Sequence, residues 1–245
     1  MPKYVISTYE IQENFQNVCV AVRDANVVIK TAELDRCTVS CYEKESRPHA
    51  VKAENGTLSI TCAQKRKWYH VIHLPRKLPQ IEICLPKTAH GALTVKCVTG
   101  KLTLHGIDCQ ALTLSGVTGA VTLSNVAAAG DIYVQRTTGE LLLSDTTCQN
   151  LTLRGKTGAV TLSNVIATGD ICIRHTTGKV ALNDCDANAL SVKVTTGGVS
   201  GRLLSEKIFT AKSTTGKISV PNPPCGGKCE IKTTTGSIRF EHPPR

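Results

Sequence analysis

A Thr-Gly pair recurs along this chain of 245 residues at an almost constant spacing of 19 or 20 residues. A longer unit repeats as well, since residues 116–154 and 155–193 share 20 identities over 39 positions and both contain the nonapeptide TGAVTLSNV. Periods of this length are typical of solenoids, in which every repeat is one coil stacked on the next. The glycines of the pairs are Gly100, Gly119, Gly139, Gly158, Gly178, Gly197, Gly216 and Gly236.

Apolar residues occupy fixed places within each unit and alternate with mostly polar ones, which points successive side chains to opposite faces of a strand. Each unit therefore contains two short strands, one on either side of Thr-Gly, that cannot bury a core alone. Five places before the glycine stand Val95, Leu114, Val134, Leu153, Ile173, Val192, Ala211 and Ile231. Two places after it stand Leu102, Val121, Leu141, Val160, Val180, Val199, Ile218 and Ile238.

These patterns predict an all-β chain folded as a right-handed parallel β-helix, a solenoid with coils of 19–20 residues. The right hand follows from the crossover preference of parallel strands. The glycine of each pair is expected to take the positive φ of a tight corner. The threonine before it is expected to hydrogen-bond corner backbone groups or its stacked neighbours.

The chain divides into an irregular part and a regular part. We expect residues 1–92 to form wider coils or a cap on the same solenoid, and residues 93–245 to form eight regular coils that follow one another. The stretch from Asn17 to Glu43 alternates as strands, ENGTLSIT indicates a hairpin or early coil around Asn55-Gly56, and IEICLP is a further strand. No Pro-, Gly- or Ser-rich linker separates the two parts.

Charge and cysteine content set limits on the partners. The formal net charge of +10 favours polyanions. No apolar run is long enough for a transmembrane helix and no secretory signal is recognised, so we expect a cytoplasmic protein, with envelope association left open. The twelve cysteines are scattered singly, and we interpret most of them as buried, reduced thiols.

Two C-terminal segments carry a specific resemblance. Residues 192–221, VKVTTGGVSGRLLSEKIFTAKSTTGKISVP, and 226–241, GGKCEIKTTTGSIRFE, are similar to the last coils of the "putative adhesin" family of bacterial β-solenoid domains of unknown function (DUF4097-like). VKAENGTLSIT, KWYHVIHL and IEICLP resemble the same family. The resemblance implies a β-helix and supplies no catalytic residue. The family's corner commonly reads Thr-Gly-Asp, whereas Lys, Ala, Glu, Gly or Ser follows the glycine here.

Six of the eight residues that stand four places before a corner glycine are basic. Because the neighbouring column faces the core, this column faces solvent, and stacking would set its charges about 5 Å apart. Such a row could follow a polyanion, or it could be a solvated face whose charges discourage aggregation. The candidate polyanion-binding residues are Lys96, Arg154, Arg174, Lys193, Lys212 and Lys232, and Ser115 and Gln135 complete the column.

Other motifs give weaker signals. The composition of KRKWYHVIHLPRK, residues 65–77, could suit a membrane surface or nucleic acid. Because the chain has one Trp and three Phe, too few for a base-stacking surface, nucleic-acid binding is disfavoured. We prefer a strand in which Trp68 is packed. Two acid pairs lie two coils apart, at about 9.6 Å, near the carboxylate spacing of inverting glycosidases. Gly-Asp, Ser-Asp and Asn-Asp are ordinary turn dipeptides, and we prefer the interpretation of these acids as turn residues. The pairs are Asp131 with Asp170 and Asp145 with Asp184.

We predict no catalytic, cofactor-binding or metal-binding residue. No Cys-x-x-Cys motif is present, and Cys37–Cys41 and Cys225–Cys229 have looser spacings without clustered histidines. A zinc clip at CGGKC is the remaining metal alternative. Cys109 and Cys148 would lie two coils apart, too far for a disulfide.

The leading functional hypothesis is a non-catalytic structural or interaction protein, an adhesin-like β-solenoid that presents polar columns to a partner such as an anionic envelope polymer. One alternative is a cytoplasmic scaffold of the bactofilin type that polymerises through its ends, because after TTTGSIRFE only HPPR protects the last coil. Another is a polysaccharide lyase or hydrolase on a β-helix. A single threonine column disfavours an ice-binding face.

Overall fold

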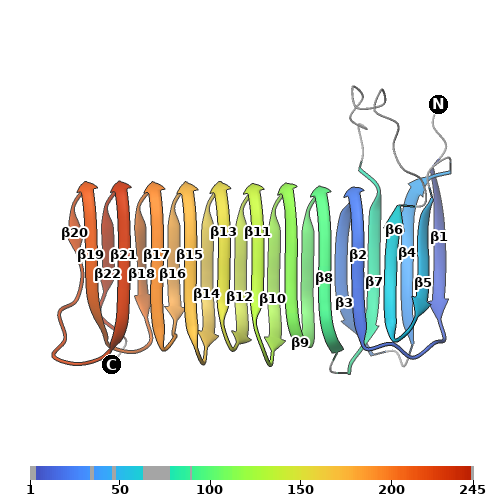
Figure 1. The fold of residues 1–245 in the computed structure, drawn as a ribbon, viewed down its shortest axis with the longest axis horizontal. Coiled ribbons are helices and arrows are strands. Elements are labelled where there is room, and N and C mark those ends of the chain that lie inside the picture. Colours follow the sequence, from blue (N-terminus) through green and yellow to red (C-terminus); the bar gives the residue numbers. More distant parts are fainter. Residues whose placement is uncertain (1–3, 34–35, 46–47, 63–77, 89, 244–245) are drawn as a thin grey trace.

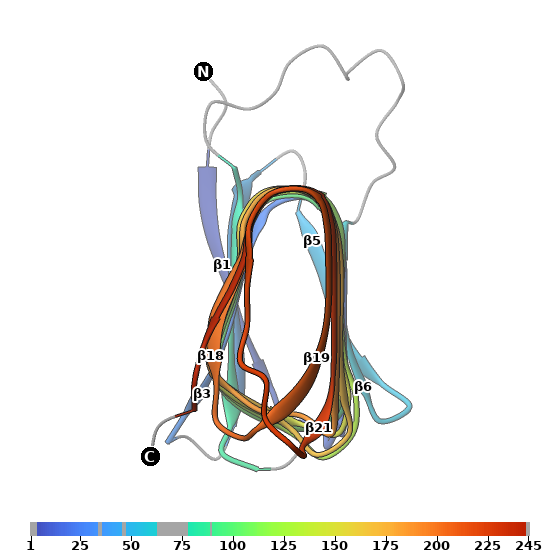
Figure 2. The same ribbon diagram turned by 90° about the vertical axis from the view of Figure 1, so that its left-hand side faces the viewer.

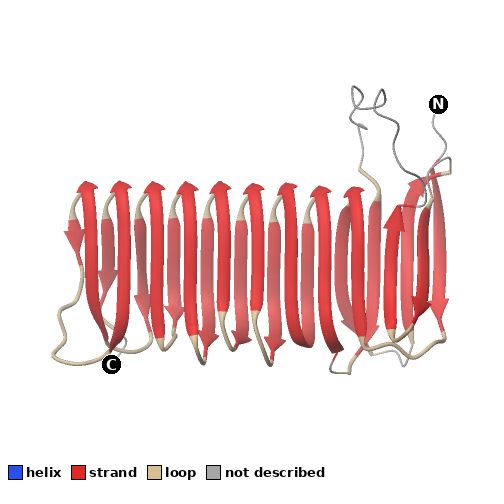
Figure 3. Ribbon diagram, viewed as in Figure 1, coloured by secondary structure: helices blue, strands red, loops and turns tan. Residues whose placement is uncertain are grey.

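The computed structural model describes residues 4–33, 36–45, 48–62, 78–88 and 90–243. Within these ranges the chain forms 22 strands and no helix, and so no helix that could cross a membrane (Figures 1 and 3). The strands stack into an elongated coil with an oval cross-section, seen end-on in Figure 2. The basic segment 65–77 lies outside the described residues, so its predicted strand is not tested.

Two long walls of hydrogen-bonded strands face each other across the core. In spatial order, the first wall contains β1 (Tyr4–Ile11), β4 (Cys37–Lys44), β7 (Gln80–Pro86), β3 (Asn26–Ala32), β9 (Leu102–Thr118), β10 (Val121–Ala128), β12 (Leu141–Cys148), β14 (Val160–Ala167), β16 (Val180–Cys185), β18 (Val199–Leu203), β22 (Ile238–Glu241) and β20 (Ile218–Ser219).

The second wall contains, in the same direction, β5 (His49–Glu54), β6 (Thr57–Cys62), β2 (Asn17–Asp24), β8 (His90–Thr99), the second half of β9, β11 (Ile132–Thr138), β13 (Leu151–Thr157), β15 (Asp170–Thr177), β17 (Ala189–Thr196), β21 (Gly227–Thr235) and β19 (Lys207–Thr215). The long strand β9 belongs to both walls, since Leu102 pairs with Val121 of β10 and Leu112 pairs with Ile132 of β11.

Nearly all pairings are parallel, so the predicted parallel β-helix is confirmed. The three antiparallel pairs, β1–β4, β4–β7 and β5–β6, lie together at the N-terminal end of the solenoid. The predicted hairpin is β5–β6, and both residues of its two-residue turn have positive φ, 50° at Asn55 and 70° at Gly56. This conformation is that of the Asn-Gly turn that matches strand twist.

The core is a set of apolar columns that run the length of the solenoid. In the column five places before the corner glycine, Val95, Leu114, Val134, Leu153, Ile173, Val192 and Ile231 are at most 1% exposed. Each of these side chains packs on the equivalent side chain of the next coil, which explains why the unit repeats: a residue that fits one coil fits them all.

The Thr-Gly corners bring backbone against backbone. All eight glycines have positive φ, and a Cβ on Gly158 would lie 2.1 Å from the carbonyl oxygen of Gly139 in the neighbouring coil. The prediction for the threonines is wrong, because within the described residues their hydroxyls make no hydrogen bond. Their backbone carbonyls do so instead, as when Thr157 accepts from the Gly139 N–H at 2.9 Å.

Spatial order departs from sequence order at the C-terminal end. β21 pairs with β17 on one side and β19 on the other, so the last coil in the sequence lies inside the stack and residues 207–219 form its end. The prediction that TTTGSIRFE is the terminal coil is therefore wrong. The exposed end strands are β19 in the second wall, where Ile208 is 51% exposed, and β20 in the first wall, where Ile218 is 44% exposed.

A similar insertion occurs at the N-terminal end. β2 pairs with β8 and β6, and β3 pairs with β9 and β7. Residues 17–32 therefore stack directly on the first regular coil, and strands later in the sequence lie outside them (Figure 1). Among the described strands, the outermost at the N-terminal end are β1 in the first wall and β5 in the second, and at the C-terminal end they are β20 and β19.

Candidate functional site

The six predicted basic residues lie in one register column along the second wall. Strand pairing aligns Arg154 with Arg174, Arg174 with Lys193, Lys193 with Lys232 and Lys232 with Lys212. These five consecutive basic residues are named the cationic ladder below. Lys96 lies in the same column but is separated from them by Ser115 and Gln135. The order of the last two rungs, Lys232 before Lys212, follows from the inserted terminal coil.

The cationic ladder faces solvent, since four of its side chains are exposed and Lys232 is half-buried. Adjacent strands place successive charges about 4.8 Å apart, so the five rungs span about 19 Å. Two places further along each strand, on the same face, stands a mostly hydroxyl-bearing column whose members are Thr137, Lys156, Thr176, Thr195, Thr234 and Thr214. The wall therefore presents cations beside hydrogen-bonding hydroxyls.

A shallow groove of about 500 Å³ runs over this face. It is lined by four ladder residues, from Arg154 to Lys232, together with the neighbouring threonines. Two buried side chains from the corner below, Arg136 and His175, also reach its lining. Along the ladder column a groove and a run of cations coincide.

The groove floor explains why the sequence repeats after 39 residues. Arg136 donates to the carbonyls of Cys97 at 3.0 Å and Gly100 at 3.2 Å, and His175 Nε2 bonds the carbonyl of Gly158 at 2.7 Å. Each large polar side chain points inward over a glycine of the preceding coil, Gly116 or Gly155, where a Cβ would lie 2.0 or 2.4 Å from it. From Gly116 to His175, a coil with glycine alternates with a coil that carries a large polar residue, and this alternation gives a period of two coils.

Sequence analysis did not find Arg136 and His175. The available signal was the column three places before the corner glycine, which reads Gly116, Arg136, Gly155, His175 and so alternates small and large residues. One nitrogen of each side chain, Arg136 Nε and His175 Nδ1, is buried without a hydrogen-bond partner in the described part of the chain. Burial of the guanidinium lowers the pKa of Arg136.

Local contacts restrain parts of the ladder. Arg154 lies over the ring of Tyr133, 5.8 Å from its centroid, which holds the guanidinium on the wall. Lys232 forms an ion pair with Glu230 on the same strand, and its hydrogen bond lowers the pKa of that carboxyl group. Because Glu230 neutralises one rung, the net charge of the ladder is concentrated on Arg154, Arg174, Lys193 and Lys212.

Of the four acidic residues considered for catalysis, Asp131 precedes β11 and Asp170 begins β15, whereas Asp145 and Asp184 lie at bends within β12 and β16. Asp184 also pairs with Arg202 and lines a shallow groove. Asp145 and Asp184 have positive φ, 47° and 53°, as expected for turn residues. Asp131 accepts a hydrogen bond from Asn150 at 2.8 Å, and Asn150 accepts one from the backbone N–H of Asp170 at 2.9 Å. These contacts tie one coil to the next, and they agree with the interpretation of these residues as turn formers.

All twelve cysteines are free thiols and seven of them are buried, which confirms the interpretation of most cysteines as buried thiols. Burial raises the pKa of Cys109 to about 11 and that of Cys148 to about 12. In CGGKC, Cys225 is exposed and Cys229 is buried in β21. The expectation that no histidine lies beside the Cys37–Cys41 pair is wrong, because His49 lies beside Cys41.

Comparison with solved structures supports the fold. The chain is similar to a "putative adhesin" from Bacteroides fragilis, with 15% identity, a TM-score of 0.62 and coverage of 98% of this chain and 97% of that one. A "putative adhesin" from Parabacteroides distasonis is 11% identical, with a TM-score of 0.47 and coverage of 97% of both chains. No curated protein matches the chain.

A family model describes nearly the whole sequence. The model, named Toastrack DUF4097, matches residues 15–244, which include the inserted N-terminal strands, all regular coils and the end coil. This agrees with the resemblance seen in the repeated corners and in the early strands. The chain therefore belongs to the Toastrack DUF4097 family.

Proposed function

We propose that this protein is a non-catalytic interaction protein whose cationic ladder binds an anionic polymer of the cell envelope. The observation that carries the proposal is the register of the five basic residues on neighbouring strands of the second wall. A rigid row of charges with a repeat of about 4.8 Å suits a ligand whose own charges repeat along a chain.

Electrostatics favours an extended ligand over a small one. Like charges so close repel one another and concentrate counterions, and a polymer that neutralises several rungs releases those counterions together. The threonine column beside the ladder supplies hydroxyl groups that can hydrogen-bond sugar hydroxyls or carboxylates. An acidic polysaccharide offers both kinds of group.

The face of the cationic ladder is poorly suited to nucleic acid, because it offers little aromatic surface for base stacking. Tyr133 lies beside Arg154 on the outer face of the second wall, and Arg154 already covers its ring. Proteins that bind single-stranded nucleic acid without sequence preference use several exposed aromatic rings. The label "putative adhesin" carried by the Bacteroides fragilis relative is consistent with binding a surface component.

Two variants of equal charge test the proposal. The triple variant R154Q/R174Q/K193Q removes three ladder cations, and the control K101Q/K179Q/K217Q removes three exposed cations that follow corner glycines. Binding to polygalacturonate and dextran sulfate, measured by calorimetry at fixed ionic strength, should weaken about tenfold or more in the ladder variant, since each lost contact removes released counterions. The control should bind within about threefold of the unaltered protein.

Equal losses in the two variants would show that net charge alone attracts the polymers, and the proposal would then be wrong. Turnover of either polymer by the purified protein would also contradict it, because the proposed function contains no chemical step. Circular dichroism of both variants checks that the solenoid remains folded.

A further inference from the structure

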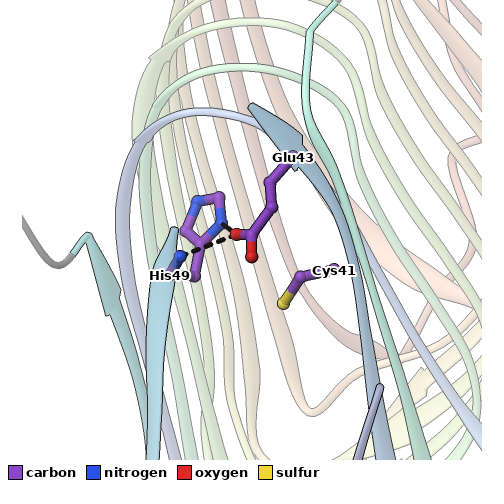
Figure 4. A group of neighbouring side chains, drawn as sticks. All are labelled: Cys41, Glu43 and His49. Atoms are coloured by element: carbon purple, nitrogen blue, oxygen red, sulfur yellow. Dashed lines mark hydrogen bonds and ion pairs between the residues drawn. The ribbon is translucent and has the colours of Figure 1, made fainter. Parts of the chain in front are cut away.

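Three potential metal ligands converge at the N-terminal end of the solenoid, far along the chain from the cationic ladder. Cys41 and Glu43 lie on β4 and His49 lies on β5, and their ligand atoms are all within 4.8 Å of one another. Figure 4 shows the thiol, carboxylate and imidazole directed into one space between the two strands. The three residues are named the cap cluster below.

The cap cluster is buried. Cys41 and Glu43 are 0% exposed and His49 is 6% exposed. Glu43 accepts hydrogen bonds from the Ser7 hydroxyl at 3.1 Å, the His49 backbone N–H at 2.6 Å and His49 Nδ1 at 2.6 Å. A fully buried carboxylate is costly unless a cation or several donors compensate it, and here three donors do so, two of them from His49.

The ligand types indicate which ion fits. Thiolate, imidazole and carboxylate together are typical ligands of zinc, whereas calcium and magnesium take oxygen ligands. Within the described residues the Cys41 thiol makes no hydrogen bond, so the sulfur atom is available to a metal. His49 and Glu43 would exchange their mutual hydrogen bond for bonds to the ion.

The position of the cap cluster gives the ion a structural role. β4 belongs to the first wall and β5 to the second, and no strand pairing joins β4 directly to β5. Among the described strands, β1 alone lies outside β4 and none lies outside β5, so fewer stacked strands hold the two walls together here than in the regular coils. A metal ion bound to Cys41, Glu43 and His49 would connect them.

We propose that the cap cluster binds one Zn²⁺-type ion that clamps the two walls of the solenoid at its N-terminal end. The ion uses Cys41 Sγ, a Glu43 carboxylate oxygen and a His49 ring nitrogen, and water or a further ligand completes the tetrahedron. Binding requires the Cys41 thiol to lose its proton to solvent.

Calorimetric titration of chelator-treated, reduced protein with Zn²⁺ tests the proposal, with Co²⁺ as a spectroscopic probe. We expect one equivalent to bind, a sulfur-to-cobalt charge-transfer band to appear, and the thermal midpoint to rise with Zn²⁺ because only the folded state holds the site. In C41S, E43Q and H49Q the affinity should fall at least tenfold. C109S and C148S, which alter buried thiols of the regular coils, should bind as the unaltered protein does.

Alkylation provides a readout that does not depend on the variants folding. In protein that is partly unfolded by denaturant, Zn²⁺ should protect Cys41 but not Cys109 from alkylation by iodoacetamide. Mass spectrometry identifies the alkylated cysteines. Retention of binding in all three cap-cluster variants would place the ion on other thiols and overturn the proposal. Absence of stoichiometric Zn²⁺ binding would also overturn the proposal. Rapid alkylation of Cys62 that is lost in H49Q would then identify Cys62, the strand partner of His49, as a reactive thiol.

Discussion

At the scale of single residues, the inner corner is a pairing of large and small side chains. His175 lies over Gly155 and bonds the carbonyl oxygens of Gly158 at 2.7 Å and Thr177 at 3.0 Å. Arg136 lies over Gly116 in the same way two coils earlier. The carbonyls of Gly100 and Gly158 point into the corner, and Arg136 and His175 are the donors that satisfy them.

A double-mutant cycle tests this pairing. Gly155→Ala should destabilise the protein by about 1–3 kcal/mol because the new Cβ would lie 2.4 Å from His175 Nδ1. His175→Ala should cost about 1–3 kcal/mol because the Gly158 carbonyl loses its donor. The loss of unfolding free energy in the double variant should be smaller than the sum of the two single losses by about 1 kcal/mol, as measured by urea denaturation.

The control pairs His175→Ala with Gly130→Ala. A Cβ on Gly130 would contact the Gln110 carbonyl rather than the His175 ring, so these two losses should add. Additivity in the Gly155 cycle as well would show that the two residues do not share space in solution.

Sequence alone predicted part of this corner. The positive φ of the glycine at each Thr-Gly pair follows from its recurrence, since a tight corner favours a residue without a Cβ. Arg136 and His175 were missed because single polar residues at inward positions look like exceptions to the apolar pattern. Only the stacked structure shows that each one fills the space left by a glycine of the preceding coil.

At the scale of elements, a partly buried ion pair anchors the end strand β19. Lys207, 5% exposed, donates to the Ala187 carbonyl at 2.6 Å and pairs with Asp186 at 2.8 Å. Burial acts to raise the pKa of Asp186, but hydrogen bonds from Lys207, Ser205 and the Ala187 N–H outweigh it and lower that pKa. The pair ties the start of β19 to the corner that follows β16.

The lowered pKa of Asp186 predicts an acid-dependent loss of stability. The stabilisation is fully present above the carboxyl pKa of the unfolded chain, near 3.9, and is lost as the pH falls through the lower folded-state value. Between pH 6 and pH 3, Asp186→Asn should lose less stability than the unaltered protein, so their urea midpoints converge in acid. Lys207→Gln removes the main partner of Asp186, so the urea midpoint of this variant should depend less on pH than that of the unaltered protein. Parallel curves for all three proteins would contradict the assignment.

Strand content could be predicted from the sequence, but the order of the outer coils could not. The spacing between Gly197, Gly216 and Gly236 is as regular as elsewhere, so the spacing gives no sign that the last two units change places. The difference lies in the segment between β20 and β21, where Pro221, Pro223 and Pro224 interrupt the pattern and β20 has only two residues. A short first-wall strand suits the end of the stack better than its interior.

At the scale of the whole molecule, the two candidate sites occupy different parts of the solenoid. The cationic ladder uses the regular coils, where one strand position is repeated, and could be located from the sequence because its members share a spacing. The cap cluster uses the antiparallel strands of the N-terminal end. Its residues have no repeated spacing, and His49 reaches Cys41 only because the chain turns from one wall to the other between β4 and β5.

The account's central claim is that the ladder acts as a linear array for an anionic polymer. The most direct test is the affinity of oligogalacturonates of increasing length, measured by calorimetry at one salt concentration. For the unaltered protein, affinity should rise with length until the ligand spans the five rungs, about 19 Å, and then level off. In R154Q/R174Q/K193Q this dependence on length should disappear. An affinity that does not change with length, or that changes equally in both proteins, would contradict the claim.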